Sequence, residues 1–145
     1  MRTFGLLACI VWGALCASQS FACQRQQDFG TSDFVFADVV VEARVIGYRT
    51  HPQKNIAYVD LETIRTLQGF EKKRWTADLR PFTSSLPETN IWGDSPVLVA
   101  LRGRITETGE FTATVIDKFC APLAIFPTDR EPGMSWKAHL ETFLK

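Results

Sequence analysis

The sequence predicts a mainly β fold, namely a small closed or nearly closed five-stranded barrel followed by a C-terminal helix. Apolar and polar residues alternate with period two through most of the middle of the chain, which is typical of strands with one buried face. Residues 135–145 instead have apolar side chains at helical spacing. Closure is expected because a small sheet must protect its edge strands from pairing with other chains.

The N-terminal residues 1–22 have the three parts of a secretory signal. Arg2 supplies positive charge, an apolar run covers residues 6–17, and Ser20 and Ala22 are small residues at the −3 and −1 positions. The run is too short to cross a bilayer as a helix, which needs about 20 residues. We therefore expect cleavage after Ala22 and a secreted or periplasmic protein without a transmembrane segment. An uncleaved anchor is the alternative.

The remaining residues 23–145 are long enough for one domain with a hydrophobic core. The chain has sixteen basic and sixteen acidic residues and therefore no formal net charge. Nucleic-acid binding normally requires a basic face, so we expect no nucleic-acid partner. The longest basic run, residues 72–74, is interpreted as a solvated turn.

The cysteines indicate the same compartment. Cys9 and Cys16 lie in the signal, which leaves Cys23 and Cys120. Two cysteines in an exported domain favour one disulfide, with two free thiols, or lipidation of Cys23, as the alternatives. The chain has two histidines and no C-x-x-C or H-E-x-x-H motif, so we expect no metal and no cofactor.

The alternation predicts five strands with one buried face each. The strands span residues 37–48, 56–67, 74–80, 96–104 and 110–118, and the last two form a hairpin around residues 106–109. The expected buried faces are Val39, Val41, Ala43 and Val45 in the first strand, and Ala57, Val59 and Leu61 in the second. Residues 82–96 are expected to form an irregular loop, because they are rich in Ser, Thr, Pro, Asn and Gly.

The C-terminal helix is expected over residues 135–145, with Ser135 as its N-cap. Its apolar stripe consists of Trp136, Leu140, Phe143 and Leu144. We interpret the stripe as a cover for one end of the sheet, with a partner or membrane surface as the alternative.

The order of these motifs resembles the netrin-like module, the fold of the inhibitory domain in tissue inhibitors of metalloproteinases. The resemblance runs from Cys23 to about Pro127. A cysteine opens the mature chain, and Cys120 falls where the family places a cysteine after its fifth strand. Residues 37–47, 67–70 and 96–100 resemble the family's first strand, the end of its second strand and a later strand segment. The resemblance implies an OB-like barrel of five strands, closed or partly open.

The resemblance also implies a testable activity. In the metalloproteinase inhibitors the free amine and carbonyl of the N-terminal cysteine chelate the catalytic zinc of the target, and Cys23 matches that position. Three positions depart from the family pattern. Gln24 replaces a small hydroxyl residue, Arg25 replaces the next cysteine, and a mid-chain cysteine is replaced near Trp92. Inhibition of a zinc metalloprotease is therefore the alternative to a more general binding function.

The leading hypothesis is a non-enzymatic, exported binding module with a protein partner, a protease being one candidate. The expected ligand surface joins Cys23 and Gln24 to the loop around Trp92. Trp92 is either an exposed binding residue or an inward-facing residue that fills the barrel mouth. A structural or assembly protein of the cell envelope, using the helix stripe, is a further alternative.

Catalytic chemistry has weak support in the sequence. His51 and His139 lie in no recognisable motif, and each is interpreted as a non-catalytic residue. Asp60 and Glu62 share one strand face and resemble an acid/base pair, but alternating acidic residues are common on a solvated strand. We therefore expect the protein not to be an enzyme.

Overall fold

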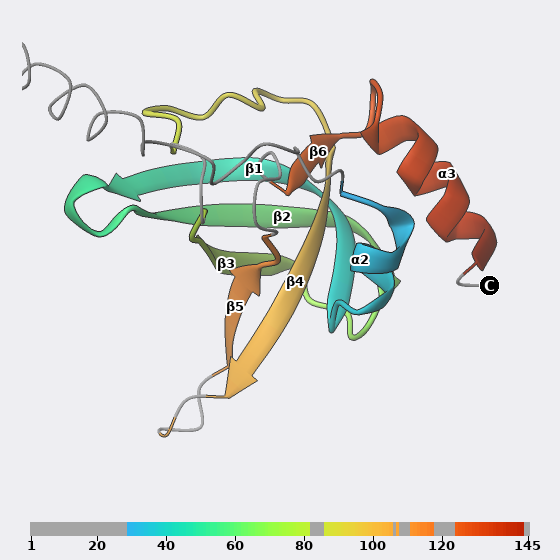
Figure 1. Cartoon of the computed structure of the whole chain (residues 1–145), viewed down its shortest axis with the longest axis horizontal. Coiled ribbons are helices and arrows are strands. Elements are labelled where there is room, and N and C mark those ends of the chain that lie inside the picture. The colour runs from blue at the N-terminus through green and yellow to red at the C-terminus, as the bar shows by residue number, and fades with distance from the viewer. Residues whose placement is uncertain (1–28, 82–85, 106, 108–110, 118–123, 144–145) are drawn as a thin grey trace, which may run out of the picture.

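The structure is a computed structural model that describes residues 29–81, 86–105, 107, 111–117 and 124–143 (Figure 1). Its strands are β1 (Val39–His51), β2 (Ile56–Gln68), β3 (Arg74–Leu79), β4 (Val97–Ile105), β5 (Phe111–Val115) and β6 (Ile125–Pro127). Its helices are α2 (Thr31–Val35), the 3-10 turn η1 (Pro52–Lys54) and α3 (Gly133–Phe143). None of the described helices is both long and apolar enough to cross a membrane.

Strands β1 to β5 form a closed barrel, which confirms the predicted fold class. They follow the order β1-β2-β3-β5-β4, and β4 pairs again with β1. All neighbours are antiparallel except β3 and β5, which run parallel and pair only at Ala77↔Ala113 and Asp78↔Thr114. This is the arrangement of an OB-type barrel. β6 is an extra strand that pairs with residues 97–99 of β4. It uses the same edge of β4 that pairs with β5 at residues 101–105.

β1 closes the barrel because it pairs along both edges. Its residues 39–43 pair with β4 on one edge, while residues 40–51 pair with β2 on the other. The β1–β2 register shifts between Val40 and Val41, between Glu42 and Ala43, and between Val45 and Gly47. Such irregularities increase local twist and bend a strand, which a small barrel requires.

The barrel interior contains the predicted faces of the first two strands. Val39, Val41, Ala43 and Val45 are buried on β1, and Ala57, Val59 and Leu61 are buried on β2. The inward residues of the other strands complete this core: Trp75, Ala77, Leu79, Val97, Val99, Leu101, Ala113 and Val115. The period-two pattern thus identified the interior correctly.

A second apolar layer lies outside the barrel over β4. Leu98 and Ala100 alternate with the inward residues of β4, yet they are fully buried. Leu98 is paired with Phe126 of β6, whose ring contacts Trp136 of α3 at 4.5 Å between centroids. Phe29 and Phe34 join the same aromatic cluster. β4 is therefore covered on both faces, which explains its continuous apolar sequence.

Helix α3 covers this layer, but it begins two residues earlier than predicted. Leu140 is fully buried and Trp136 is half-buried in the aromatic cluster, so these two residues of the stripe cover the sheet. Phe143 is exposed, and Leu144 lies outside the described residues.

The prediction that Ser135 caps the helix is wrong. Ser135 lies within the first turn, and its hydroxyl and backbone N–H both donate to the carboxylate of Glu131, at 2.6 and 3.4 Å. Gly133, the first residue of the helix, lies directly against the backbone of Pro127, where a Cβ atom would be 2.2 Å from the carbonyl oxygen.

Two short elements, α2 and β6, were not predicted. They contain five and three residues, which is too short for either helical or period-two spacing to be recognised. β5 also ends at Val115, three residues before the predicted end, while the predicted turn at residues 106–109 lies outside the described residues except for Glu107.

The close approach at Gly133 predicts an unusual response to Gly133→Ala. At an ordinary helix position this change stabilises a protein by about 1 kcal/mol. Here we expect it to lower the free energy of unfolding by about 1–3 kcal/mol, because the backbone of Pro127 blocks the new methyl group. Urea unfolding would measure the effect, with the exposed Thr142→Ala in the same helix as the control. A stabilised Gly133→Ala variant would contradict the close packing of α3 on β6.

The ion pair between β1 and α3 supports a second prediction. Glu42 is buried and accepts hydrogen bonds from Lys137 Nζ at 2.6 Å and Thr128 Oγ1 at 3.2 Å. Lys137→Met would leave the carboxylate without its cation, so we expect the free energy of unfolding to fall by about 2–3 kcal/mol. Arg65→Met breaks the exposed pair with Glu141 and should cost less than about 1 kcal/mol. Equal losses in the two variants, measured by urea unfolding, would show that burial of Glu42 has no special effect.

Candidate functional site

Cys23 and Cys120, the two cysteines of the predicted disulfide, are each followed by a segment, and these two segments contact each other. Cys23, Gln24 and Cys120 lie outside the described residues. Phe29 lies six residues after Cys23, and Phe126 lies six residues after Cys120. Their rings contact each other with centroids 5.2 Å apart. The chain that enters α2 therefore lies beside β6.

Trp92 occupies the inward position, one of the two that the sequence left open. Its side chain is 5% exposed, and its indole Nε1 donates a hydrogen bond to the backbone oxygen of Ile125 at 3.1 Å. Its backbone N–H donates to Asn90 Oδ1 at 2.9 Å. Trp92 thus attaches its loop to β6. Whether this loop binds a ligand stays a prediction.

Tyr48 holds the same loop from β1. Its hydroxyl donates to the backbone oxygen of Pro87 at 2.7 Å, and its ring lies edge-on to Trp92 at 5.7 Å. The loop runs along β1 before it enters β4, as Figure 1 shows. Two buried or half-buried aromatic side chains therefore fix the described loop residues 86–96 on the barrel.

The same loop presents an exposed apolar residue. Ile91 is 60% exposed although its neighbour Trp92 is buried. Residues 88–90 are also exposed. We call residues 86–94, together with β6 and Phe29, the β6 edge. It brings together the predicted loop and the segments that flank both cysteines.

The remaining sequence candidates do not converge. His51 ends β1 and is half-buried, whereas His139 is exposed on α3 with its ring against Phe143. Asp60 accepts a hydrogen bond from Thr76 Oγ1 at 2.7 Å and pairs with Arg49 at 3.0 Å. Its predicted companion Glu62 pairs separately with Arg74, at 3.6 Å. Each carboxylate therefore has its own arginine. In the part of the chain that the structure describes, no three His, Cys, Asp or Glu residues are placed to hold a metal ion.

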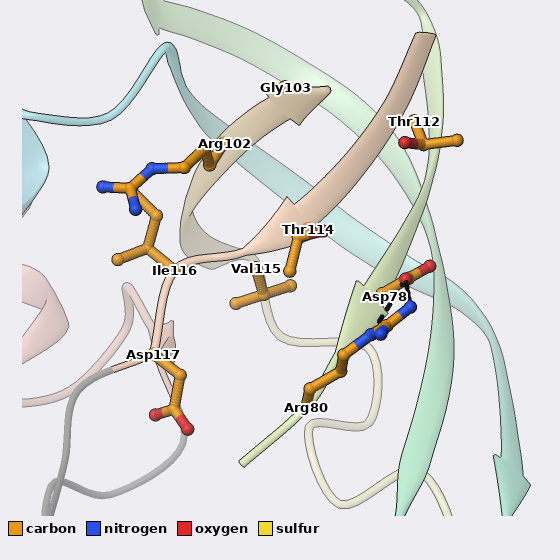
Figure 2. A pocket seen from close by; sticks show the side chains of 9 residues that line it. All are labelled: Asp78, Arg80, Arg102, Gly103, Thr112, Thr114, Val115, Ile116 and Asp117. Carbon is orange, nitrogen blue, oxygen red and sulfur yellow. Dashed lines mark hydrogen bonds and ion pairs between the residues drawn. The ribbon is translucent and has the colours of Figure 1, made fainter. Parts of the chain in front are cut away.

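A polar pocket of about 410 Å³ lies on the outer face of β3, β5 and β4. The register places Asp78, Thr114 and Arg102 in one row across these three strands. Figure 2 shows Thr114 and Val115 between the Asp78–Arg80 pair on one side and Arg102 on the other. The sequence did not predict this pocket, because β3 and β5 are joined only through the tertiary fold.

The charges in this pocket are balanced. Asp78 accepts hydrogen bonds from Arg80 Nε at 3.1 Å and Nη2 at 2.5 Å, which neutralise its carboxylate. Arg102 and Asp117 contribute one further charge of each sign to the lining. The pocket can accept a polar ligand through guanidinium and hydroxyl groups, but its balanced charge favours no strongly anionic or cationic one.

The burial of Tyr48 leads to a pH prediction. Desolvation raises the pKa of its hydroxyl above 10.0. The chain has two tyrosines, so Tyr58→Phe leaves Tyr48 as the only one. We expect the tyrosinate absorbance of this variant to titrate with a midpoint above pH 10, because burial favours the neutral hydroxyl. A midpoint at or below pH 10 would contradict the attachment of the loop to Tyr48.

The same shift makes a prediction for stability. Because the pKa is higher in the folded state, the contribution of Tyr48 is complete below pH 10 and is lost as pH rises through the folded pKa. At neutral pH, adding Tyr48→Phe to Tyr58→Phe should cost about 1 kcal/mol through the lost hydrogen bond to Pro87. Urea unfolding of both variants should show this difference shrinking above pH 10.

Comparison of the chain with models of protein families and with curated proteins finds no match.

Proposed function

We propose that this chain is an exported, non-enzymatic binding module of the netrin-like type, and that its ligand surface is the β6 edge. The observation that carries the proposal is the position of β6. This strand contacts Phe29 through the ring of Phe126 and holds Trp92 through the backbone of Ile125. Cys23 and Gln24 form the expected N-terminal part of the ligand surface, which we call the N-terminal ridge. The segment that follows this ridge and the predicted loop both contact the same short strand.

The barrel supports the netrin-like assignment. Its five strands follow the OB order, and its first long strand begins after a short lead-in segment, as the resemblance implies. This topology is shared by proteins of many functions, so it supports the fold more strongly than the activity.

The contact between Phe29 and Phe126 supports a Cys23–Cys120 disulfide. Each of these residues is six positions from its cysteine, a reach of about 20 Å in a fully extended chain. The two sulfurs can therefore meet beside β6. A disulfide there would restrict the N-terminal ridge and reduce the entropy that it loses on binding.

The disulfide is tested by the intact mass of the processed protein. We expect a chain that begins at Cys23 and whose mass rises by about two daltons on reduction, because a disulfide becomes two thiols. An unchanged mass, or a chain that starts elsewhere, would remove the proposed ridge.

The binding surface is tested by site-specific photo-cross-linking in the cell that produces the protein. A cross-linking side chain at Ile91 is compared with one at Met134, which has a similar exposure of 50% but lies on α3. We expect a discrete adduct from position 91 alone, and its loss in the Cys120→Ser variant. An adduct from position 134 alone would instead favour an assembly protein that uses its helix. The absence of adducts at both positions would contradict a binding role for the β6 edge.

A further inference from the structure

The basic run of residues 72–74, which we interpreted as a solvated turn, forms one wall of a groove. Two adjoining pockets share Thr63, Ile64, Lys72 and Lys73. The larger has a volume of about 720 Å³ and is completed by Arg44, Glu62 and Arg74. We call this larger pocket the basic groove. It lies on the outer face of β1, β2 and β3 and shares no lining residue with the pocket drawn in Figure 2.

The register of the barrel brings Arg44 to the groove. Arg44 on β1 is paired with Glu62 on β2, and Glu62 is paired with Arg74 on β3. Neighbouring strands are about 4.8 Å apart, so the three side chains form a row with the carboxylate in the centre. Glu62 contacts Arg74 at 3.6 Å. One carboxylate between two guanidinium groups leaves an excess of positive charge in this row.

Two lysines add to this excess on a backbone that is fixed to β2. The backbone N–H of Thr63 donates to the oxygen of Lys73 at 2.9 Å, and its hydroxyl donates to the oxygen of Lys72 at 2.6 Å. Lys72 Nζ lies 5.1 Å from the centre of the Trp75 ring. The groove is therefore a formed surface, and its basic wall is attached to the sheet.

Two of the cations are available to a ligand. Among the described residues, the side chains of Arg44 and Lys73 have no ion pair or hydrogen-bond partner, and both are exposed. The lining of the basic groove contains four cations and one carboxylate. The whole chain has no formal net charge, so this is a local concentration of positive charge. The adjoining smaller pocket adds Arg65, which already pairs with Glu141, and Glu71.

We propose that the basic groove binds a phosphate-bearing ligand. Arginine presents its donors in a fork that matches phosphate oxygens, and lysine adds a point charge. Ile64 lies in the same lining and is 45% exposed. An apolar surface beside four cations suits a phosphate ester with an apolar part rather than inorganic phosphate alone. A soluble ester and a lipid headgroup share this chemistry.

The test compares two variants with the same change in net charge. Arg44→Gln combined with Lys73→Gln removes the two available cations of the groove. Lys54→Gln combined with Arg130→Gln removes two exposed cations elsewhere. The probes are phenyl phosphate, and vesicles of phosphatidylglycerol mixed with phosphatidylcholine. Circular dichroism of both variants establishes that the fold is retained.

We expect the groove variant to bind at least one of the two probes about thirtyfold more weakly than the wild type, since it lacks two cations that each contribute about 1 kcal/mol near an anionic surface. The control variant should stay within about twofold, because distant charges are screened. Loss with phenyl phosphate alone assigns a soluble ester, and loss with vesicles assigns a lipid headgroup. Equal weakening in both variants, or no binding of either probe, would overturn the proposal. Tighter binding of a single-stranded oligonucleotide than of both probes would also overturn it.

The proposal is independent of the proposed function. The basic groove shares no residue with the β6 edge, so cross-linking at Ile91 and phosphate binding at Arg44 can succeed or fail separately.

Discussion

The double pairing of β1 is the constraint on which the rest of the structure depends. Its first residues hydrogen-bond to β2 along one edge and to β4 along the other. A strand can do this in a small barrel only if it is strongly bent, and the three register irregularities against β2 allow that bend. Without the β1–β4 pairing the five strands would form an open sheet with two long exposed edges. With it, every inward side chain enters one shared core.

Closure also divides the outer surface into a covered and an uncovered part. β6, α2 and α3 cover the first half of β4, where Leu98 and Ala100 are buried. The aromatic cluster around Phe126 and Trp136 seals this layer. The outer faces of β2, β3 and β5 have no such cover within the described residues, and the outward side chains there are mostly polar or charged, with Ile64 of β2 as an exposed apolar residue. Both polar pockets described above lie on these uncovered faces.

Cross-strand rows determine what these two faces can recognise. In the row Arg44–Glu62–Arg74 the one carboxylate pairs with Arg74, so the positive charge of Arg44 remains. In the row Asp78–Thr114–Arg102, Asp78 is neutralised by Arg80, and the remaining lining is balanced. The same barrel therefore has two chemically different polar surfaces, and neither overlaps the β6 edge.

The sequence by itself determined the strands and the interior, because period-two alternation is a local consequence of strand geometry. Val39, Val41, Ala43 and Val45 on β1, and Ala57, Val59 and Leu61 on β2, face inward as their spacing predicts. It also determined the C-terminal helix, although Ser135 was wrongly assigned as its cap. The resemblance to netrin-like modules predicted the OB-type barrel as well.

Apart from the predicted β4–β5 hairpin, only the tertiary structure decided which strands became neighbours. Arg44 and Lys73 are far apart in the chain and meet because β1 pairs with β2 and β2 with β3. Asp78 and Thr114 meet because β3 and β5 run parallel, a contact that no local pattern records. Trp92 could have faced either way, and the backbone oxygen of Ile125, on a three-residue strand too short to predict, holds it inward. Residue spacing specifies which face a side chain occupies, whereas closure of the barrel specifies what lies opposite it.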